Sequence, residues 1–241
     1  MNSFETIIYE KKSGIGFIIL NRPQFLNVYN IKMRDELYQV LEAIKDDNEV
    51  RVVIIRGAGE KAFCAGADLT EFLSAPPPVF ARQVRFERDI WGLFLSITQP
   101  LIAALHGYVL GSGVEISLLC DIRIASEDVK FGLPEVGLGI IPAAGGTQTL
   151  PRTIGIPRSL EMLLAGRWLN ADEAYRYKMV NRVVPRSDLQ STTERLAEKI
   201  KNHLPEAITL AKQAVVRGLE MSLADGLNLE SHLNMLSGEL N

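Results

Sequence analysis

Two glutamates and two turns of small residues are best suited to chemistry in this sequence. Glu115 follows a glycine-rich turn at 111–113, Glu135 follows a short apolar strand, and 65–68 forms the second turn. A helix that begins at such a turn leaves N–H groups without intrahelical partners and favours a developing anion. Two carboxylates can act as general acid and base when their surroundings separate their pKa values. The pattern favours oxyanion stabilisation with proton transfer by carboxylates.

Each of these features also has a purely structural interpretation. Glu115 complements the dipole of the helix that it begins, and Glu135 can accept hydrogen bonds from loop amides. Spacing along the chain does not show whether the loops at 65–68, 111–115 and 133–135 meet in space. His106, which lies between the predicted strand 101–105 and the loop 111–115, is interpreted as a structural residue.

Composition narrows the classes of function. The 241 residues are 47% hydrophobic with a net charge of −3, which is typical of a globular protein and gives no general attraction to nucleic acid or anionic membranes. No apolar run approaches the ~18 residues of a membrane span. Two cysteines, Cys64 and Cys120, make no disulfide framework or metal cluster and are predicted to be small buried hydrophobes. We expect a cytoplasmic protein with neither nucleic acid nor membrane as partner.

Hydrophobic periodicity predicts short strands that alternate with helices, followed by a helical tail. The predicted strands are 6–10, 14–20, 50–56, 101–105, 122–125, 129–131 and 180–184, and the predicted helices include 30–46, 80–97, 187–203, 205–217 and 222–236. Such alternation indicates βαβ units, in which ligands sit beyond the carboxyl ends of strands.

Polar residues and prolines mark the ends of these elements. Asn30 is predicted to cap the first helix, and the segments 170–173 and 187–190 both resemble capping boxes. The prolines at 76–78 cannot continue a helix and predict a surface loop.

Several blocks of sequence, in the same order, resemble the crotonase superfamily of enoyl-CoA hydratases and isomerases. The blocks are 20–23 (LNRP), 62–69 (AFCAGADL), 111–115 (GSGVE), 120–125 (CDIRIA), 131–135 (FGLPE) and 142–147 (PAAGGT). The resemblance implies an α/β fold, the crotonase (ClpP-like) spiral of repeated ββα units with a helical C-terminal region. It assigns 1–185 to the core with the CoA and active site, and 186–241 to a helical trimerisation region. Whether this region is truncated or ends in disordered residues is left open.

The resemblance also implies a role for individual residues. The backbone amides of Ala67 and Ser112 would bind the thioester carbonyl, Glu115 would activate the water that attacks C3, and protonated Glu135 would deliver a proton to C2. The implied reaction is reversible syn hydration of a 2-enoyl-CoA to a 3-hydroxyacyl-CoA. The residues implied in substrate binding are Arg22, Ala65, Gly66, Asp68, Leu69, Gly111 and Leu133.

The same resemblance implies an acyl-CoA thioester as partner, with no metal and no separate cofactor because CoA is part of the substrate. It implies a homotrimer or a hexamer built as a dimer of trimers. Two residues depart from the pattern of the family. Thr70 stands where many relatives have a basic residue near the CoA adenine, and Leu133 stands where short-chain hydratases often have glutamine. The adenine contacts and the acyl preference are therefore left open. Arg22 and Lys61 are either contacts to CoA phosphates or solvated charges.

Alternative functions stay open. One is a double-bond isomerase that relies mainly on Glu135, and another is a non-catalytic CoA-thioester- or RNA-binding member. Both glutamates together favour hydratase, since relatives with other activities commonly replace one or both. The residues that either line an acyl pocket or pack in the core are Phe72, Leu73, Phe80, Phe86 and Trp91.

Overall fold

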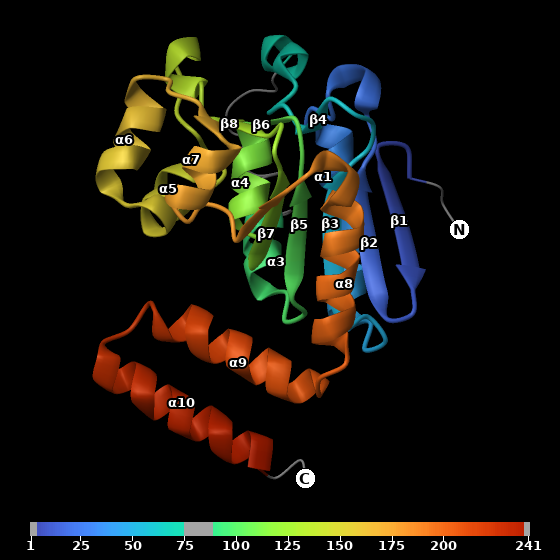
Figure 1. The fold of residues 1–241 in the computed structure, drawn as a ribbon, viewed down its shortest axis with the longest axis vertical. Helices are drawn as coiled ribbons and strands as arrows, with labels where there is room; N and C mark the ends of the chain where they lie inside the picture. The colour runs from blue at the N-terminus through green and yellow to red at the C-terminus, as the bar shows by residue number, and fades with distance from the viewer. Residues whose placement is uncertain (1–3, 75–88, 239–241) are drawn as a thin grey trace.

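The structure is a computed structural model, and it describes residues 4–74 and 89–238 (Figure 1). Its strands are β1 (Ile7–Lys12), β2 (Ile15–Leu20), β3 (Val52–Gly57), β4 (Ala62–Cys64), β5 (Leu101–Leu105), β6 (Tyr108–Leu110), β7 (Ile122–Ser126), β8 (Lys130–Gly132), β9 (Leu169–Asn170) and β10 (Arg182–Val184). Its α-helices are α1 (Ile31–Asp46), α3 (Ile90–Ser96), α4 (Ser112–Leu118), α5 (Gly146–Ile154), α6 (Ile156–Leu164), α7 (Ala171–Arg176), α8 (Leu189–Lys201), α9 (Pro205–Gly218) and α10 (Leu223–Gly238). Short 3-10 helices are η1 (Pro23–Phe25), η2 (Leu69–Ser74), η3 (Glu135–Leu138) and η4 (Arg186–Asp188).

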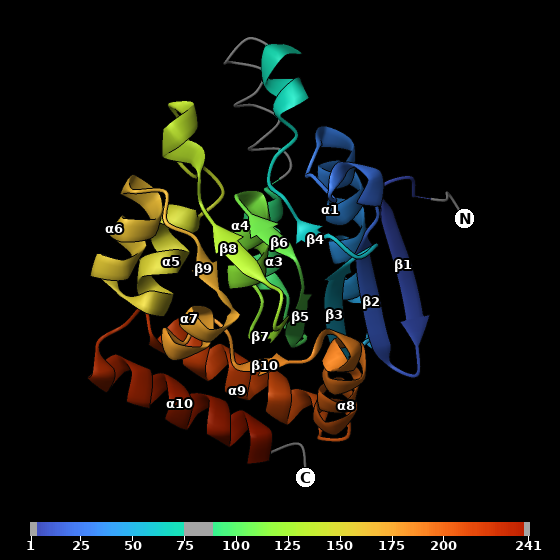
Figure 2. The same ribbon diagram turned by 45° about the horizontal axis from the view of Figure 1, so that its top comes forward.

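Successive strands alternate between two sheets. The larger sheet has the order β1-β2-β3-β5-β7-β10, and the smaller has the order β4-β6-β8-β9. From β3 to β8, each strand of the larger sheet is followed by a strand of the smaller one. All pairs from β2 to β10 in the larger sheet are parallel. The chain therefore winds as a spiral and not as the single doubly wound sheet that strand–helix alternation alone also allowed (Figure 2).

Alternate residues of the larger sheet face two different cores, as the pleat of a strand requires. Val53 and Ile55 of β3 belong to the main core, with residues of α1, α3 and α4. Ile54 and its neighbour Ile102 on β5 belong to a second core beneath α8. Burial on both faces explains why these strands read as continuous apolar runs.

The first helix forms as predicted. The Asn30 side chain accepts a hydrogen bond from the Met33 N–H at 2.9 Å and so satisfies one of the free donors of the first turn of α1. The predicted apolar face is buried: Met33, Leu37, Val40, Leu41 and Ile44.

Three other predictions have different outcomes. The capping box at 170–173 is confirmed, because Asn170 and Glu173 exchange hydrogen bonds at the start of α7. The one at 187–190 is wrong: η4 leads directly into α8, and Asp188 caps it without a side-chain bond. Of the predicted helix 80–97, the described part is α3, while the proline loop at 76–78 lies outside the described residues.

The tail consists of α8, which packs on the larger sheet, and the pair α9 and α10, which lie side by side in both views (Figures 1 and 2). Lys212 of α9 donates hydrogen bonds to Asp121 Oδ2 at 2.7 Å and to the Gln99 carbonyl at 3.0 Å. Asp121 also accepts the Leu101 N–H at 2.7 Å, so one carboxylate joins α9 to the start of β5. Among the described residues, no helix combines the length and apolarity needed to cross a bilayer.

Candidate active site

Glu115 is positioned by a sharp turn between β6 and α4. Gly111 follows β6 and caps α4 with φ 49° and ψ −120°, a conformation that glycine adopts without a Cβ penalty. The carboxylate of Glu115, in the first turn of α4, is buried, and its Oε1 accepts hydrogen bonds from the backbone N–H groups of Ala144 at 2.8 Å and Gly146 at 2.9 Å. The turn before α5 therefore fixes the orientation of this charged group.

Glu135 begins η3, directly after β8, and its carboxyl group lies against Gly111. A Cβ placed on Gly111 would be 3.0 Å from Glu135 Oε1. Its other oxygen, Oε2, is buried and makes no hydrogen bond with any described residue. Burial raises the pKa of the Glu135 carboxyl, and the charge of Glu115 raises it further. The two glutamates are thus in different environments: one is fixed by amides, and the other is biased toward its protonated form.

The two glycine-containing loops are in backbone contact. A Cβ on Gly111 would come within 3.3 Å of the Gly66 Cα atom, so the absence of side chains at both positions permits the approach. Ala67 pairs with Tyr29 through the Tyr29 N–H to Gly66 carbonyl bond at 2.8 Å and the Asp68 N–H to Tyr29 carbonyl bond at 2.9 Å. In the described part of the chain, neither the Ala67 N–H nor the Ser112 N–H donates to a backbone carbonyl. The structure therefore brings together all three loops.

Arg22 and Asp68 bind each other. The Arg22 guanidinium donates to Asp68 Oδ2 at 2.9 Å and to the Val28 carbonyl at 2.8 Å, and both side chains of the ion pair are mostly buried. Hydrogen bonding from Thr70 and then from Arg22 lowers the pKa of Asp68. Arg22 is therefore not a solvated surface charge, and it holds η1 against the Ala67 loop.

The remaining residues predicted to bind substrate or line an acyl pocket lie in different parts of the structure. Ala65 and Gly66 lie in the loop that contacts Gly111, and Leu69, which begins η2, is exposed. Leu133 is buried in the main core. Trp91 packs with Tyr29 and Phe94, whereas Phe80, Phe86 and the side chains of Phe72 and Leu73 lie outside the described part.

The two cysteines and the possibility of a metal site were also considered from the sequence. Cys64 and Cys120 are free and buried, as predicted, and burial raises the pKa of each thiol to about 12. Over residues 4–74 and 89–238, no cluster of three or more His, Cys, Asp or Glu side chains is arranged to hold a metal ion.

Comparison with known proteins agrees with this geometry. The sequence profile of the enoyl-CoA hydratase/isomerase family matches residues 10–237. The chain belongs to this family. The short-chain-enoyl-CoA hydratase of Clostridium acetobutylicum is 39% identical over 93% of the chain and 86% of that protein. The (E)-benzylidenesuccinyl-CoA hydratase of Thauera aromatica is 37% identical over 94% and 88%.

Solved structures of the enoyl-CoA hydratase/isomerase family have the same fold. The enoyl-CoA hydratase of Bacillus anthracis superposes with a TM-score of 0.90 at 40% identity, over 96% of this chain and 90% of the other. The predicted crotonase fold, a mixed α/β spiral with a helical C-terminal region, is confirmed.

Two features of this family member were missed by sequence reasoning. The backbone amides of Ala144 and Gly146 bind Glu115, whereas the sequence alone indicated no role for the block 142–147. Tyr29 places a buried, unpartnered hydroxyl group beside the Ala67 loop, and burial raises its pKa, with a smaller contribution from the charge of Glu115. The available signal was a tyrosine directly before Asn30, the predicted cap of the first helix.

Proposed function

We propose that the chain catalyses the reversible syn hydration of a 2-enoyl-CoA thioester to a 3-hydroxyacyl-CoA. The observation that carries the proposal is the junction of three loops, which places the amide-fixed carboxylate of Glu115 near the protonation-prone carboxyl of Glu135. Two amides without backbone partners, those of Ala67 and Ser112, lie in the same junction. Hydratase names among the relatives support the same reaction.

In the proposed mechanism, the thioester carbonyl accepts hydrogen bonds from the Ala67 and Ser112 N–H groups. These donors stabilise the enolate that forms as water adds to the C=C bond, and they are fixed before the reaction begins. Glu115 removes a proton from the water that attacks C3. Glu135, protonated beforehand, delivers its proton to C2, and the same groups act in reverse during dehydration.

The other proposed properties follow from this reaction and from the family. Only water is added or removed, so the reaction needs no redox group, and CoA enters with the substrate. We assign the CoA and active site to 1–185 and subunit contacts to 186–241, in a homotrimer or a dimer of trimers in the cytoplasm. Exposed apolar side chains on the last two helices support such contacts: Val215, Val216, Leu219, Leu223 and Leu227.

The substrate is best identified by mass spectrometry with straight-chain, branched, alicyclic and aromatic 2-enoyl-CoAs. The two relatives are named for acyl groups of very different size, so both ends of this range belong in the panel. A product heavier by one water supports hydration. A 3-enoyl-CoA that rearranges without gaining mass would instead indicate isomerisation.

Glu115→Gln and Glu135→Gln test the roles of the two carboxyls. Glutamine keeps an oxygen that can accept the Ala144 and Gly146 N–H bonds, so the fold should persist. Loss of one general acid or base typically lowers the rate about 10²- to 10⁴-fold. Full hydratase activity in either folded variant would refute the two-glutamate mechanism.

A further inference from the structure

A polar cavity lies on the side of the larger sheet that faces α8. It has a volume of about 380 Å³, and its lining includes Arg56, His106, Arg186 and the backbone of Gly57–Gly59. Arg56 and Ala104 belong to the sheet face that packs on α8, whereas Val114 and Ile116, which flank Glu115, belong to the main core. The cavity is therefore separate from the junction proposed for the thioester.

The positive charges of two guanidinium groups in this cavity are only weakly balanced by carboxylates or hydrogen-bond acceptors. Arg56 Nε is buried without a hydrogen-bond partner, and no carboxylate in the described part of the chain forms an ion pair with Arg56. Arg186 contacts Glu60 at 3.6 Å and the Gly59 carbonyl at 3.4 Å, but the Glu60 side chain is 89% exposed. A guanidinium group that is partly removed from water is costly without an anion, and its planar donors suit oxyanions.

His106 supplies a different group to the same cavity. It is only 2% exposed, and its Nε2 has no hydrogen-bond partner. Burial and then the charge of Arg186 lower its pKa to about 4, so the ring is neutral at pH 7. A hydrogen bond to backbone Gly59 therefore involves Nδ1, which leaves Nε2 as an unused acceptor.

The acidic groups nearby do not fill this set of donors and acceptors. The charge of Asp128 favours protonation of His106, but Asp128 already accepts a hydrogen bond from Ser126. Glu194 accepts a bond at 2.8 Å from Gln190, which also lines the cavity. The Arg56 Nε–H, the Arg186 N–H groups that do not contact Glu60 or Gly59, and the His106 Nε2 acceptor therefore remain for a ligand.

We propose that this cavity binds inorganic phosphate. The guanidinium groups of Arg56 and Arg186 bind the charged oxygens, and His106 Nε2 accepts a hydrogen bond from the protonated oxygen that phosphate keeps at neutral pH. Sulfate has the same shape but no such proton. The volume of the cavity is large enough for one phosphate ion.

Calorimetric titration of the full chain with inorganic phosphate and with sulfate, at constant ionic strength, tests the site. Phosphate should bind about tenfold more tightly than sulfate, the difference expected for one hydrogen bond. Arg186→Gln, a partly exposed position, should weaken phosphate binding at least about tenfold. His106→Asn should remove the preference for phosphate over sulfate.

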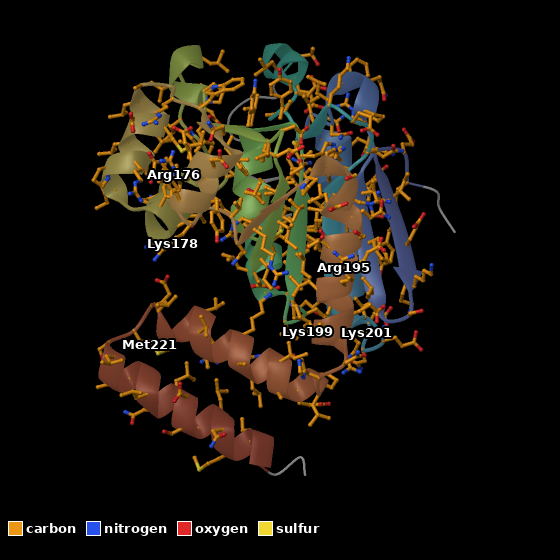
Figure 3. The ribbon with its side chains drawn as sticks, viewed as in Figure 1. Arg176, Lys178, Arg195, Lys199, Lys201 and Met221 are labelled. Carbon is orange, nitrogen blue, oxygen red and sulfur yellow. The ribbon has the colours of Figure 1, made fainter. Side chains whose placement is uncertain are left out.

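Arg195→Gln is the matched control, because it also removes one positive charge, but from a residue of α8 that does not line the cavity (Figure 3). It should leave phosphate binding unchanged. No binding by the wild-type protein, or equal losses in Arg186→Gln and Arg195→Gln, would overturn the proposal.

CoA and dephospho-CoA distinguish this site from one for the phosphate of the substrate. Saturation with CoA should leave the affinity for inorganic phosphate unchanged, and Arg186→Gln should weaken neither CoA nor dephospho-CoA. Weaker binding of CoA but not of dephospho-CoA in Arg186→Gln would show that the cavity belongs to the CoA site. That result would overturn a separate site while leaving the proposed hydration intact.

Discussion

Gly146 controls how closely the turn before α5 approaches Glu115. A Cβ at this position would lie 3.0 Å from both Glu115 Oε1 and the Pro142 Cβ atom, so Gly146→Ala must displace the carboxylate or the turn. Displacement of a reacting group by about 1 Å can cost roughly 100-fold, and we expect kcat to fall about 10- to 100-fold. Steady-state kinetics with the best 2-enoyl-CoA measure this loss.

Gly137→Ala is the control for that substitution. Gly137 lies in η3, near Glu135, but a Cβ there would meet no atom within 4 Å. Its kcat should stay within about twofold of wild type, as for most substitutions that touch nothing. Equal losses in the two variants would mean that the contact with Glu115 is not the cause.

The pKa of Glu135 predicts a pH dependence. Because its pKa is raised, the folded protein holds the Glu135 proton more tightly than the unfolded chain does. The associated stability is present at low pH and is lost as pH rises through the folded pKa. For hydration, kcat/KM should fall over the same interval, because the carboxyl must be protonated to act as an acid.

Glu115→Gln separates the two causes of this shift. It removes the neighbouring charge but leaves Glu135 buried, so the pKa of Glu135 should decrease and yet stay above the ordinary value for glutamate. NMR titration of the Glu135 carboxyl carbon measures it. An unchanged or higher pKa would contradict the electrostatic coupling between the two glutamates.

At the scale of elements, the sequence predicted those helices and strands that are determined by residues close to one another in the chain. The helix 31–46 follows from a capping asparagine and an apolar period, both of which are present within a few residues. β6 was missed because its three residues lie between Gly107 and Gly111, and its strand character comes from pairing with β4 and β8. The Arg22–Asp68 ion pair joins residues far apart in sequence, which no local pattern reports.

The two predicted capping boxes give a matched test. In α7, Asn170 accepts the Glu173 N–H bond at 2.9 Å, so Asn170→Ala should lower the free energy of unfolding by about 1 kcal/mol. Asp188 caps α8 without a side-chain bond to the helix, so Asp188→Ala should have a smaller effect. Chemical denaturation compares the two variants, and a larger loss in Asp188→Ala would contradict this interpretation.

At the scale of the whole molecule, the candidate active site forms because successive turns of the spiral lie next to one another. The loops after β4, β6 and β8 meet because these strands are parallel neighbours in the smaller sheet, although strands of the other sheet separate them in sequence. Alternation of strands and helices does not reveal that second sheet. The residues of the candidate site were therefore recognisable by resemblance, whereas their contact depends on long-range pairing.

The attachment of α9 to the body gives a prediction at this scale. The ion pair between Lys212 and Asp121 is mostly buried, with side chains 15% and 26% exposed. Lys212→Ala removes bonds to Asp121 and Gln99 and should destabilise the attachment of α9 by about 1–3 kcal/mol. Because α8 keeps its own core on the larger sheet, limited proteolysis should then cut between Lys201 and Pro205 and release α9 with α10.

The control is Arg217→Ala, which removes an exposed cation from the same helix. This variant should be cut no faster than wild type. Faster cleavage before residue 189 would instead mean that the whole tail, α8 included, detaches as one unit at the predicted boundary near residue 185.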